Sequence, residues 1–180
     1  MKRNLIVLLS LSVMLAFIAP VVTNAQAGKA NFSGNWAFNA DKSNMGQAPA
    51  QGQGQGQGRG MGGFGGGNFV AKQEANLLTV ERTRTNQQGE TTTTTTKYTL
   101  DGKESVNTTR MGDSKSVATW SADGKSLTIA TTSVFNMNGE SREMKSSEVW
   151  TLKDANTLSV TRTSATPNGD RTQTMVYDKK

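Results

Sequence analysis

Residues 117–130 read Val-Ala-Thr-Trp-Ser-Ala-Asp-Gly-Lys-Ser-Leu-Thr-Ile-Ala. Apolar and polar side chains alternate on both sides of Asp123-Gly124, a dipeptide typical of two-residue β-hairpin loops. With a loop of that length Trp120 lies opposite Leu127, so an apolar side chain faces an apolar side chain across the two strands. The stretch therefore predicts an antiparallel hairpin with one apolar face.

The same apolar face continues into the neighbouring hairpins. A two-residue loop at Asn138-Gly139 pairs Leu127 with Trp150, and Ile129 with Glu148. A loop at Asn168-Gly169 likewise predicts two pairs nearer the C-terminus, Val160 with Tyr177 and Arg162 with Met175.

Seven turn signals divide residues 69–178 into eight strands, and the alternating segment at residues 32–39 makes a ninth. No long segment has the period of an amphipathic helix. The predicted apolar face carries Leu78, Val80, Tyr98, Leu100, Trp120, Leu127, Ile129, Trp150, Leu152, Leu158, Val160, Met175 and Tyr177. Such a meander hides its apolar face by closing into a barrel or by folding into a sandwich. The hairpins favour an all-β fold: an antiparallel up-and-down meander closed into a barrel of about 8–10 strands, which also removes the edge strands.

The N-terminus has the pattern of an export signal. Lys2 and Arg3 precede an apolar run, and Ala25-Gln26-Ala27 supplies the small residues that a signal peptidase reads. The run is shorter than the roughly 20 apolar residues of a membrane span. We expect residues 1–27 to be a signal peptide, the protein to be periplasmic or extracellular, and no stable membrane insertion to remain after cleavage.

The composition excludes several chemistries. The 180 residues include no cysteine and no histidine, so a Ser-His-Asp triad, a Cys-His dyad, a thiolate or imidazole zinc site and a disulfide are all excluded. Loss of Lys2 and Arg3 leaves 18 basic against 14 acidic residues, a net charge of +4. The basic residues are scattered, which argues against nucleic-acid binding. We expect no cofactor, no metal and no catalytic activity.

Two tracts have unusual composition. Residues 45–68 hold 11 of the 19 glycines and are predicted to form a flexible Gly/Gln-rich loop inside the barrel domain of residues 28–180. Thr91 to Thr96 form a run of six threonines, which suits a solvated strand face because threonine is β-branched.

The opening Phe32-Ser33-Gly34-Asn35-Trp36, with the late run Glu148-Val149-Trp150-Thr151-Leu152, resembles small exported bacterial proteins with a lipocalin-like domain. In lipocalins a Gly-x-Trp tryptophan closes the barrel base beneath a basic side chain from a late strand. The resemblance implies a base role for Gly34 and Trp36. It leaves Arg162 and Arg171 as alternatives for the basic partner. It also implies that the Gly/Gln insertion, between the first two strands, overhangs the mouth.

Alternation brings polar and aromatic side chains onto the predicted interior face, where Glu148 lies opposite or diagonal to Arg162 according to loop length. An internal ion pair is one reading of these two residues. A guanidinium that receives a ligand carboxylate in two parallel hydrogen bonds is the other. The predicted ligand-binding residues are Arg82, Tyr98, Trp120, Glu148, Trp150, Arg162 and Tyr177.

The leading functional hypothesis is non-catalytic binding of a small hydrophobic or carboxylate-bearing ligand inside the barrel. The alternative is an envelope or extracellular structural or interaction protein whose barrel is filled by side chains, with an unknown protein partner. A carboxylate enzyme that uses Glu148 is the third reading, and the absence of a visible acid pair argues against it.

Overall fold

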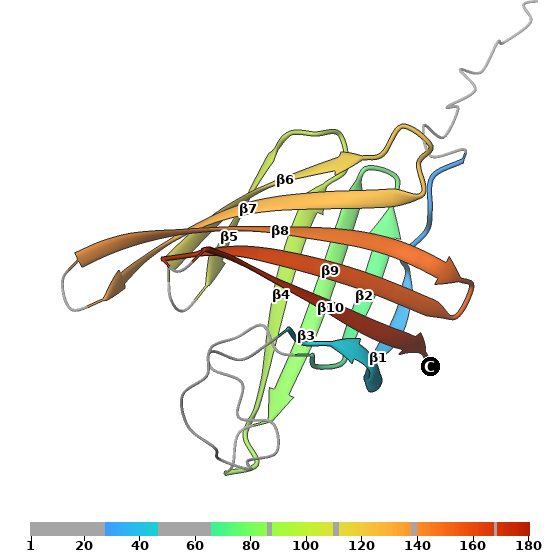
Figure 1. Cartoon of the computed structure of the whole chain (residues 1–180), viewed down its shortest axis with the longest axis horizontal. Coiled ribbons are helices and arrows are strands. Elements are labelled where there is room, and N and C mark those ends of the chain that lie inside the picture. The colour runs from blue at the N-terminus through green and yellow to red at the C-terminus, as the bar shows by residue number, and fades with distance from the viewer. Residues whose placement is uncertain (1–27, 47–65, 86–87, 110–111, 138–139, 168) are drawn as a thin grey trace, which may run out of the picture.

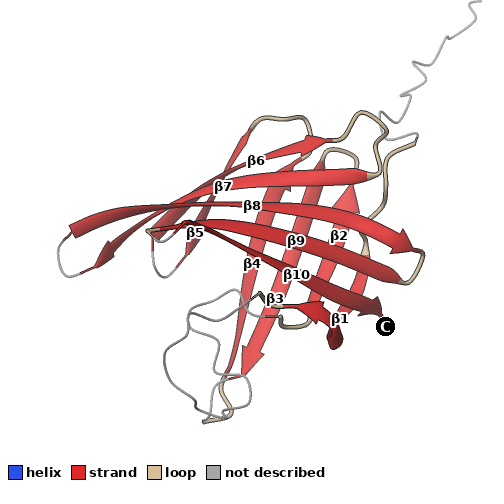
Figure 2. Ribbon diagram, viewed as in Figure 1, coloured by secondary structure: helices blue, strands red, loops and turns tan. Residues whose placement is uncertain are grey.

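The computed structural model describes residues 28–46, 66–85, 88–109, 112–137, 140–167 and 169–180. The predicted signal peptide and most of the predicted Gly/Gln-rich loop lie outside these residues. The described chain consists of ten strands and their connections (Figure 2). The strands are β1 (Gly34–Asn44), β2 (Phe69–Glu74), β3 (Leu77–Thr85), β4 (Thr91–Thr99), β5 (Glu104–Thr109), β6 (Gly112–Trp120), β7 (Ser126–Met137), β8 (Glu140–Asp154), β9 (Thr157–Thr166) and β10 (Gly169–Lys179).

The ten strands form one antiparallel sheet in the order β4-β3-β2-β1-β10-β9-β8-β7-β6-β5. Each strand pairs with its neighbour in sequence, except that β1 pairs with β10 and the backbones of β4 and β5 are unpaired. The sheet curls until β4 and β5, its two ends, lie against each other (Figure 1). The predicted all-β fold, an antiparallel up-and-down meander of about 8–10 strands curled into a barrel, is confirmed: the barrel has ten strands and is nearly closed.

The structure has one strand more than the nine counted from the turn signals. The extra turn lies at Ala75 and Asn76, between β2 and β3, where Ala75 has a φ of 33°. Asn76 is the single turn-favouring residue here, without the glycine of the other turns or the paired Asp and Asn of residues 154–156, so the signal is weaker than those used to count the strands. The Asn76 carbonyl accepts a hydrogen bond from the Leu100 amide at 2.8 Å, which helps to hold the turn in place.

The predicted pairing is confirmed for the central hairpins. Trp120 pairs with Leu127, Leu127 with Trp150, and Ile129 with Glu148. The prediction for the last hairpin was wrong by two residues.

In that hairpin Tyr177 pairs with Leu158, and Met175 pairs with Val160. The reason is that Thr166 pairs with Gly169, so the connection lies one residue earlier than Asn168-Gly169. Each residue of β10 therefore pairs with a residue two positions away from the predicted one on β9. Because side chains alternate along a strand, a shift of two residues changes the partner but keeps the side chain on the same face.

One end of the barrel, here called the base, is packed with aromatic side chains. Phe32 is fully buried and stacks on Trp120, with ring centroids 5.8 Å apart, and meets Trp150 edge to face. The indole Nε1 of Trp36 donates to the Phe32 carbonyl at 2.9 Å. The Gln73 side chain holds the segment before β1, since its Oε1 accepts from the Phe32 amide and its Nε2 donates to the Ala30 carbonyl.

The cation over Trp36 is Lys179, whose Nζ lies 5.5 Å from the ring centroid. Neither Arg162 nor Arg171, the two predicted alternatives, has this position. Lys179 does because β10 ends beside β1 and pairs Lys179 directly with Trp36. A Cβ at Gly34 would lie 2.6 Å from Lys179 Cε, so glycine leaves room for this lysine stem.

The opposite end of the barrel, here called the open end, is solvated on both faces of its strands. Residues 91–95 of β4 and 140–143 of β8 are exposed throughout. In Figure 1 the β7–β8 hairpin extends beyond the neighbouring strands. The barrel therefore has a packed end and a wet end.

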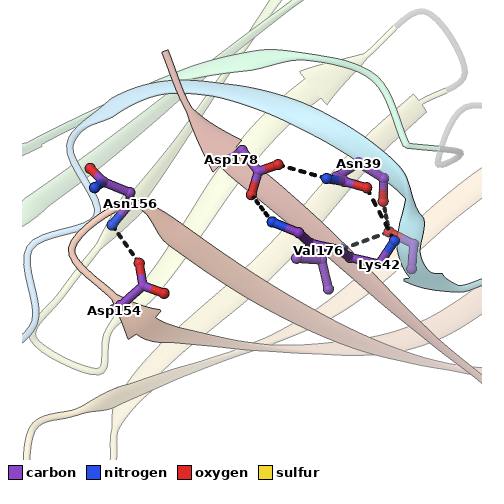
Figure 3. A network of polar contacts seen from close by, with 7 residues as sticks. Asn39, Lys42, Asp154, Asn156, Val176 and Asp178 are labelled. Atoms are coloured by element: carbon purple, nitrogen blue, oxygen red, sulfur yellow. Dashed lines mark hydrogen bonds and ion pairs between the residues drawn. The ribbon is translucent and has the colours of Figure 1, made fainter.

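A polar network bends β1 towards the open end (Figure 3). The pairing of β1 with β10 shifts register between Asn39 and Asn44. There the Ser43 hydroxyl donates to the Asn39 carbonyl at 2.6 Å and accepts from the Val176 amide at 2.8 Å, in place of ladder bonds. The Asp178 carboxylate accepts from Asn39 Nδ2 at 2.6 Å and from Lys42 Nζ at 2.9 Å.

The described flank of the Gly/Gln insertion lies at the open end as a result. The Met45 carbonyl accepts hydrogen bonds from Gln173 Nε2 at 3.0 Å and from Arg171 Nη2 at 3.3 Å. Gln173 is the cross-strand partner of Arg162 on β9. The chain thus enters the insertion close to the polar side chains of the barrel interior.

None of the described residues belongs to a helix of the length and apolar character needed to cross a membrane.

Candidate functional site

Five of the predicted site residues form a polar cluster in the barrel interior, above the aromatic base. They are Arg82, Tyr98, Glu148, Arg162 and Tyr177, from β3, β4, β8, β9 and β10. Each lies on the inward face of its strand because it is an even number of residues from a buried apolar side chain, as Arg82 is from Val80 and Leu78. This polar cluster is the candidate ligand site.

Arg162 and Glu148 form the ion pair at its centre. They are direct cross-strand partners, and Arg162 Nη1 lies 3.3 Å from Glu148 Oε1. Their side chains are 5% and 16% exposed, so this pair is largely withdrawn from water. Arg162 Nε also donates to Ser164 Oγ at 3.1 Å, and Nη2 donates to Ser146 Oγ at 3.4 Å. The sequence left open whether the two residues were opposite or diagonal, and they are opposite.

Glu148 links the ion pair to the aromatic base. Its Oε2 accepts a hydrogen bond from the indole Nε1 of Trp150 at 3.0 Å. Trp150 is fully buried and packs on Phe69 and Phe32. A change in the charge or contacts of Glu148 is therefore felt directly by one tryptophan indole.

The two tyrosines approach the ion pair from other walls of the barrel. Burial raises the pKa of Tyr98 well above its usual value, and the Glu148 carboxylate adds to this rise while Arg82 and Arg162 oppose it. Burial raises the pKa of Tyr177 to about 12, against the lowering effect of Arg82. Both phenols are thus neutral hydroxyl groups that can donate a hydrogen bond at any physiological pH. In the structure the Tyr177 hydroxyl donates to Met175 Sδ at 3.5 Å.

Arg82 completes the cluster from β3. Its guanidinium carbon lies 5.0 Å from the centroid of the Phe69 ring, close enough for a cation–π contact. Hydrogen bonding to Arg82 also lowers the pKa of Tyr177, which places the guanidinium next to that phenol. Arg82 is only partly buried.

The polar cluster carries two guanidinium groups against one carboxylate. Burial lowers the pKa of Arg162 and the Glu148 carboxylate raises it, but guanidinium keeps its proton throughout the physiological range. In ionised form the cluster therefore has a formal excess of one positive charge. That excess, beside two neutral phenols, is suited to an acidic oxygen group.

Hydroxyl groups ring the cluster, and several of them were not singled out from the sequence. Ser116 is buried and shares a hydrogen bond of 2.9 Å with Thr131, while Ser146 and Ser164 bond Arg162. All four lie on the inward face by the same alternation that places Glu148. Serine and threonine are so common in this chain that residue type alone did not separate these four from outward ones.

The remaining predicted residues, Trp120 and Trp150, belong to the aromatic layer beneath the cluster. Trp150 touches the cluster through Glu148, whereas Trp120 packs between Phe32 and Lys29, whose Nζ lies 5.4 Å from the ring centroid. Within the part of the chain that the structure describes, the buried Nε1 of Trp120 meets no hydrogen-bond partner.

Among the described residues no three acidic side chains gather in a way that would hold a metal ion. The cluster has one carboxylate, and the chain has no histidine or cysteine to act with it. Its chemistry is that of hydrogen bonding and charge pairing.

No protein-family model matches the chain, and no curated protein sequence matches it. Among solved structures the chain is similar to the zebrafish ileal bile acid-binding protein, crystallised with cholic acid, at 19% sequence identity and a TM-score of 0.43. The match covers 63% of this chain and 72% of that protein. Because this likeness is weak, the fold assignment rests on the strand order and register.

Proposed function

We propose that this protein is exported and binds one small, largely apolar ligand inside its barrel, without catalysing a reaction. The observation that carries the proposal is the polar cluster, where two guanidinium groups and two phenols meet a single carboxylate above an apolar base. The aromatic and aliphatic walls are chemically suited to an apolar ligand body, and Arg82 and Arg162 are suited to an acidic head group.

Side-chain exposure towards the open end supports a route from the polar cluster to solvent. On β8 the inward-facing Ser146, one step towards the open end from Glu148, is half-buried, and Arg142 further along is exposed. On β3 Arg82 is half-buried and Arg84 is exposed. Exposure is thus greater at the rim than at the cluster, which supports entry of a ligand from this end.

A matched pair of probes tests the proposal: a medium-chain fatty acid and its methyl ester, titrated against tryptophan fluorescence. We expect the acid to bind more tightly than the ester, because only the acid offers an oxyanion to a guanidinium. Trp150 should report the binding, since it bonds Glu148. Native mass spectrometry should find one acid molecule per chain. If neither probe binds, the proposal is wrong.

Substitutions in the polar cluster should change the dissociation constants of the acid and of the ester by different amounts. Arg82→Met should lower the affinity for the acid by about tenfold, equivalent to about 1.4 kcal/mol, and leave the affinity for the ester nearly unchanged. Glu148→Gln should raise the affinity for the acid, because it removes the carboxylate that competes for the guanidinium groups. Lys115→Met is the matched control, since this lysine faces outwards on β6 and pairs with Glu104 at the surface.

Export is supported by the sequence of residues 1–27, with Ala27 before the expected cleavage site. Cell fractionation and the intact mass of the protein test it. We expect a mature chain that begins at Gly28, and a full-length protein in the cytoplasm would contradict export.

The alternative function is an envelope or extracellular interaction protein with a filled barrel. The close packing of Phe32, Trp36, Phe69 and Trp150 in the base favours it. Deletion of residues 46–67 distinguishes the two functions. Loss of a co-purifying protein with unchanged probe binding would support the alternative, and loss of probe binding alone would support the ligand site.

A further inference from the structure

The seam between β4 and β5 is closed by side chains along only part of its length. The Asn107 side chain of β5 takes the place of a neighbouring strand's backbone. Its Oδ1 accepts a hydrogen bond from the Lys97 amide at 2.8 Å, and its Nδ2 donates one to the Lys97 carbonyl at 2.9 Å. Ser105 Oγ accepts from the Thr99 amide at 2.8 Å. These three bonds satisfy the β4 edge near the base.

The rest of the β4 edge, Thr91–Thr95, has no such cover. In an antiparallel strand alternate residues direct both backbone groups to the same neighbour. Because Lys97 and Thr99 face the seam, Thr91, Thr93 and Thr95 also direct their N–H and C=O groups away from β3. Among the described residues none of these groups meets a protein partner, and all five threonines are exposed.

This edge lacks the features by which proteins block strand pairing. Proline, charged side chains and β-bulges are the usual devices, and Thr91–Thr95 contains no proline and no charge. The pairing of β3 with β4 runs through nine consecutive residue pairs without a register shift, from Leu77 with Thr99 to Thr85 with Thr91. The edge is therefore uncharged and without a bulge in its pairing with β3, so its backbone groups are able to pair with another strand.

We propose that a second copy of this chain occupies the edge, by antiparallel pairing of β4 with β4. The free groups belong to odd-numbered residues in both copies, so odd residues must face odd residues. The register that pairs the most of them sets Thr93 opposite Thr93 of the second copy, and Thr91 opposite Thr95.

Every facing pair over residues 91–95 is then threonine with threonine, a favourable cross-strand pair. The outward row Thr83–Thr93, whose hydroxyls are 3.0 Å apart within one chain, continues into the second copy. Pairing of identical uncharged segments brings no like charges together. A two-fold axis closes the assembly as a dimer rather than a filament.

The test is sedimentation of the purified protein over a range of concentrations, with variants at the two-fold axis. The unmodified protein should show a reversible monomer–dimer equilibrium. Thr93→Lys should raise the dimer dissociation constant by at least about tenfold, since it sets two lysines opposite each other. Thr83→Lys is the matched control: it adds the same charge to the neighbouring strand but leaves the edge intact.

Mixing two variants of opposite charge tests the proposed register, in which Thr93 faces Thr93 of the second copy. Thr93→Glu alone should also be monomeric, and an equimolar mixture of T93K and T93E should form a heterodimer. Circular dichroism checks that both variants keep their strands. A monomer at every concentration, or a dimer that T93K does not weaken, would overturn the proposal. Binding of an extended peptide by a protein that stays monomeric would assign the edge to another partner and would also overturn it.

Discussion

The guanidinium of Arg162 is almost completely buried, yet it has the contacts that make burial tolerable. Glu148 supplies a countercharge, and the hydroxyls of Ser146 and Ser164 accept further hydrogen bonds. A buried charge is costly when it loses its partner and much less so when both partners are removed together. At the residue scale this ion pair couples barrel stability to the chemistry of the site.

Arg162→Met should lower the free energy of unfolding by about 3 kcal/mol, because Glu148 is left largely buried without its cation. The double variant E148Q/R162M should recover a large part of that loss. Urea denaturation measures both. Arg142→Met is the control: its pair with Glu140 is well exposed, so the loss should be below about 0.5 kcal/mol. Equal losses for the single and the double variant would contradict this account.

Burial of the two tyrosine phenols should make the free energy of unfolding depend on pH in the alkaline range. A tyrosine in the unfolded chain has the ordinary phenol pKa of about 10, whereas Tyr177 has a pKa of about 12 in the folded protein and the pKa of Tyr98 is shifted in the same direction. Above about pH 10 only the unfolded chain loses these protons, so stability is complete below that pH and falls as pH rises towards about 12.

The near-ultraviolet absorbance of phenolate, together with denaturation at each pH, checks this prediction. These are the only two tyrosines in the chain, so the folded protein should show no phenolate transition near about pH 10. Tyr177→Phe should flatten the decline in stability. A transition of the native protein in that range would show that a tyrosine is exposed.

At the element scale the hairpin is the unit that sequence patterns predict well. Alternation and the Asp123-Gly124 turn gave the correct partner for Trp120, and the error at Tyr177 changed the partner without changing the face. The turn at Ala75 was missed because Asn76 is its single turn-favouring residue. Hairpin pairing depends on residues close in sequence, so local chemistry specifies it.

The seam between β4 and β5 is an element-scale feature with its own prediction. Asn107→Leu should speed hydrogen exchange of the Lys97 amide, because it removes the acceptor of that N–H, and should cost about 1–2 kcal/mol for two lost hydrogen bonds. Ser105→Ala is the matched comparison. It should affect the Thr99 amide and leave Lys97 protected. Unchanged exchange of Lys97 in Asn107→Leu would show that the seam is closed in another way.

At the scale of the whole molecule the two ends of the barrel differ: the base is packed with buried aromatic side chains, and the open end is solvated. The segment before β1 completes the base, since Phe32 fills the space between Trp120 and Trp150. Packing at the base provides stability without disulfides in a chain that has no cysteine. The open end, by contrast, is solvated, and it is the end at which the proposed ligand would enter.

Phe32→Ala should therefore destabilise the whole barrel by about 3–5 kcal/mol, as expected for removal of a fully buried ring. Val106→Ala is the control, because Val106 is 59% exposed and its loss should stay within about 0.5 kcal/mol. Thermal unfolding measures both. A loss below about 1 kcal/mol for Phe32→Ala would mean that the segment before β1 is not part of the cooperative barrel.

Local alternation and turn residues were enough to predict the strands other than the division between β2 and β3, the apolar face, and the position of Arg162 beside Glu148. These signals relate residues of the same strand or of adjacent strands, because side chains alternate between the two faces of each strand. Other features depend on how the sheet curls: Lys179 over Trp36, Arg82 beside Tyr177, and the half-covered β4 edge. The first two contacts join strands that are distant in sequence, and the twist and closure of the complete sheet bring them together. The β4 edge borders β5, the next strand in sequence, but its partial cover depends on how the two ends of the curled sheet meet.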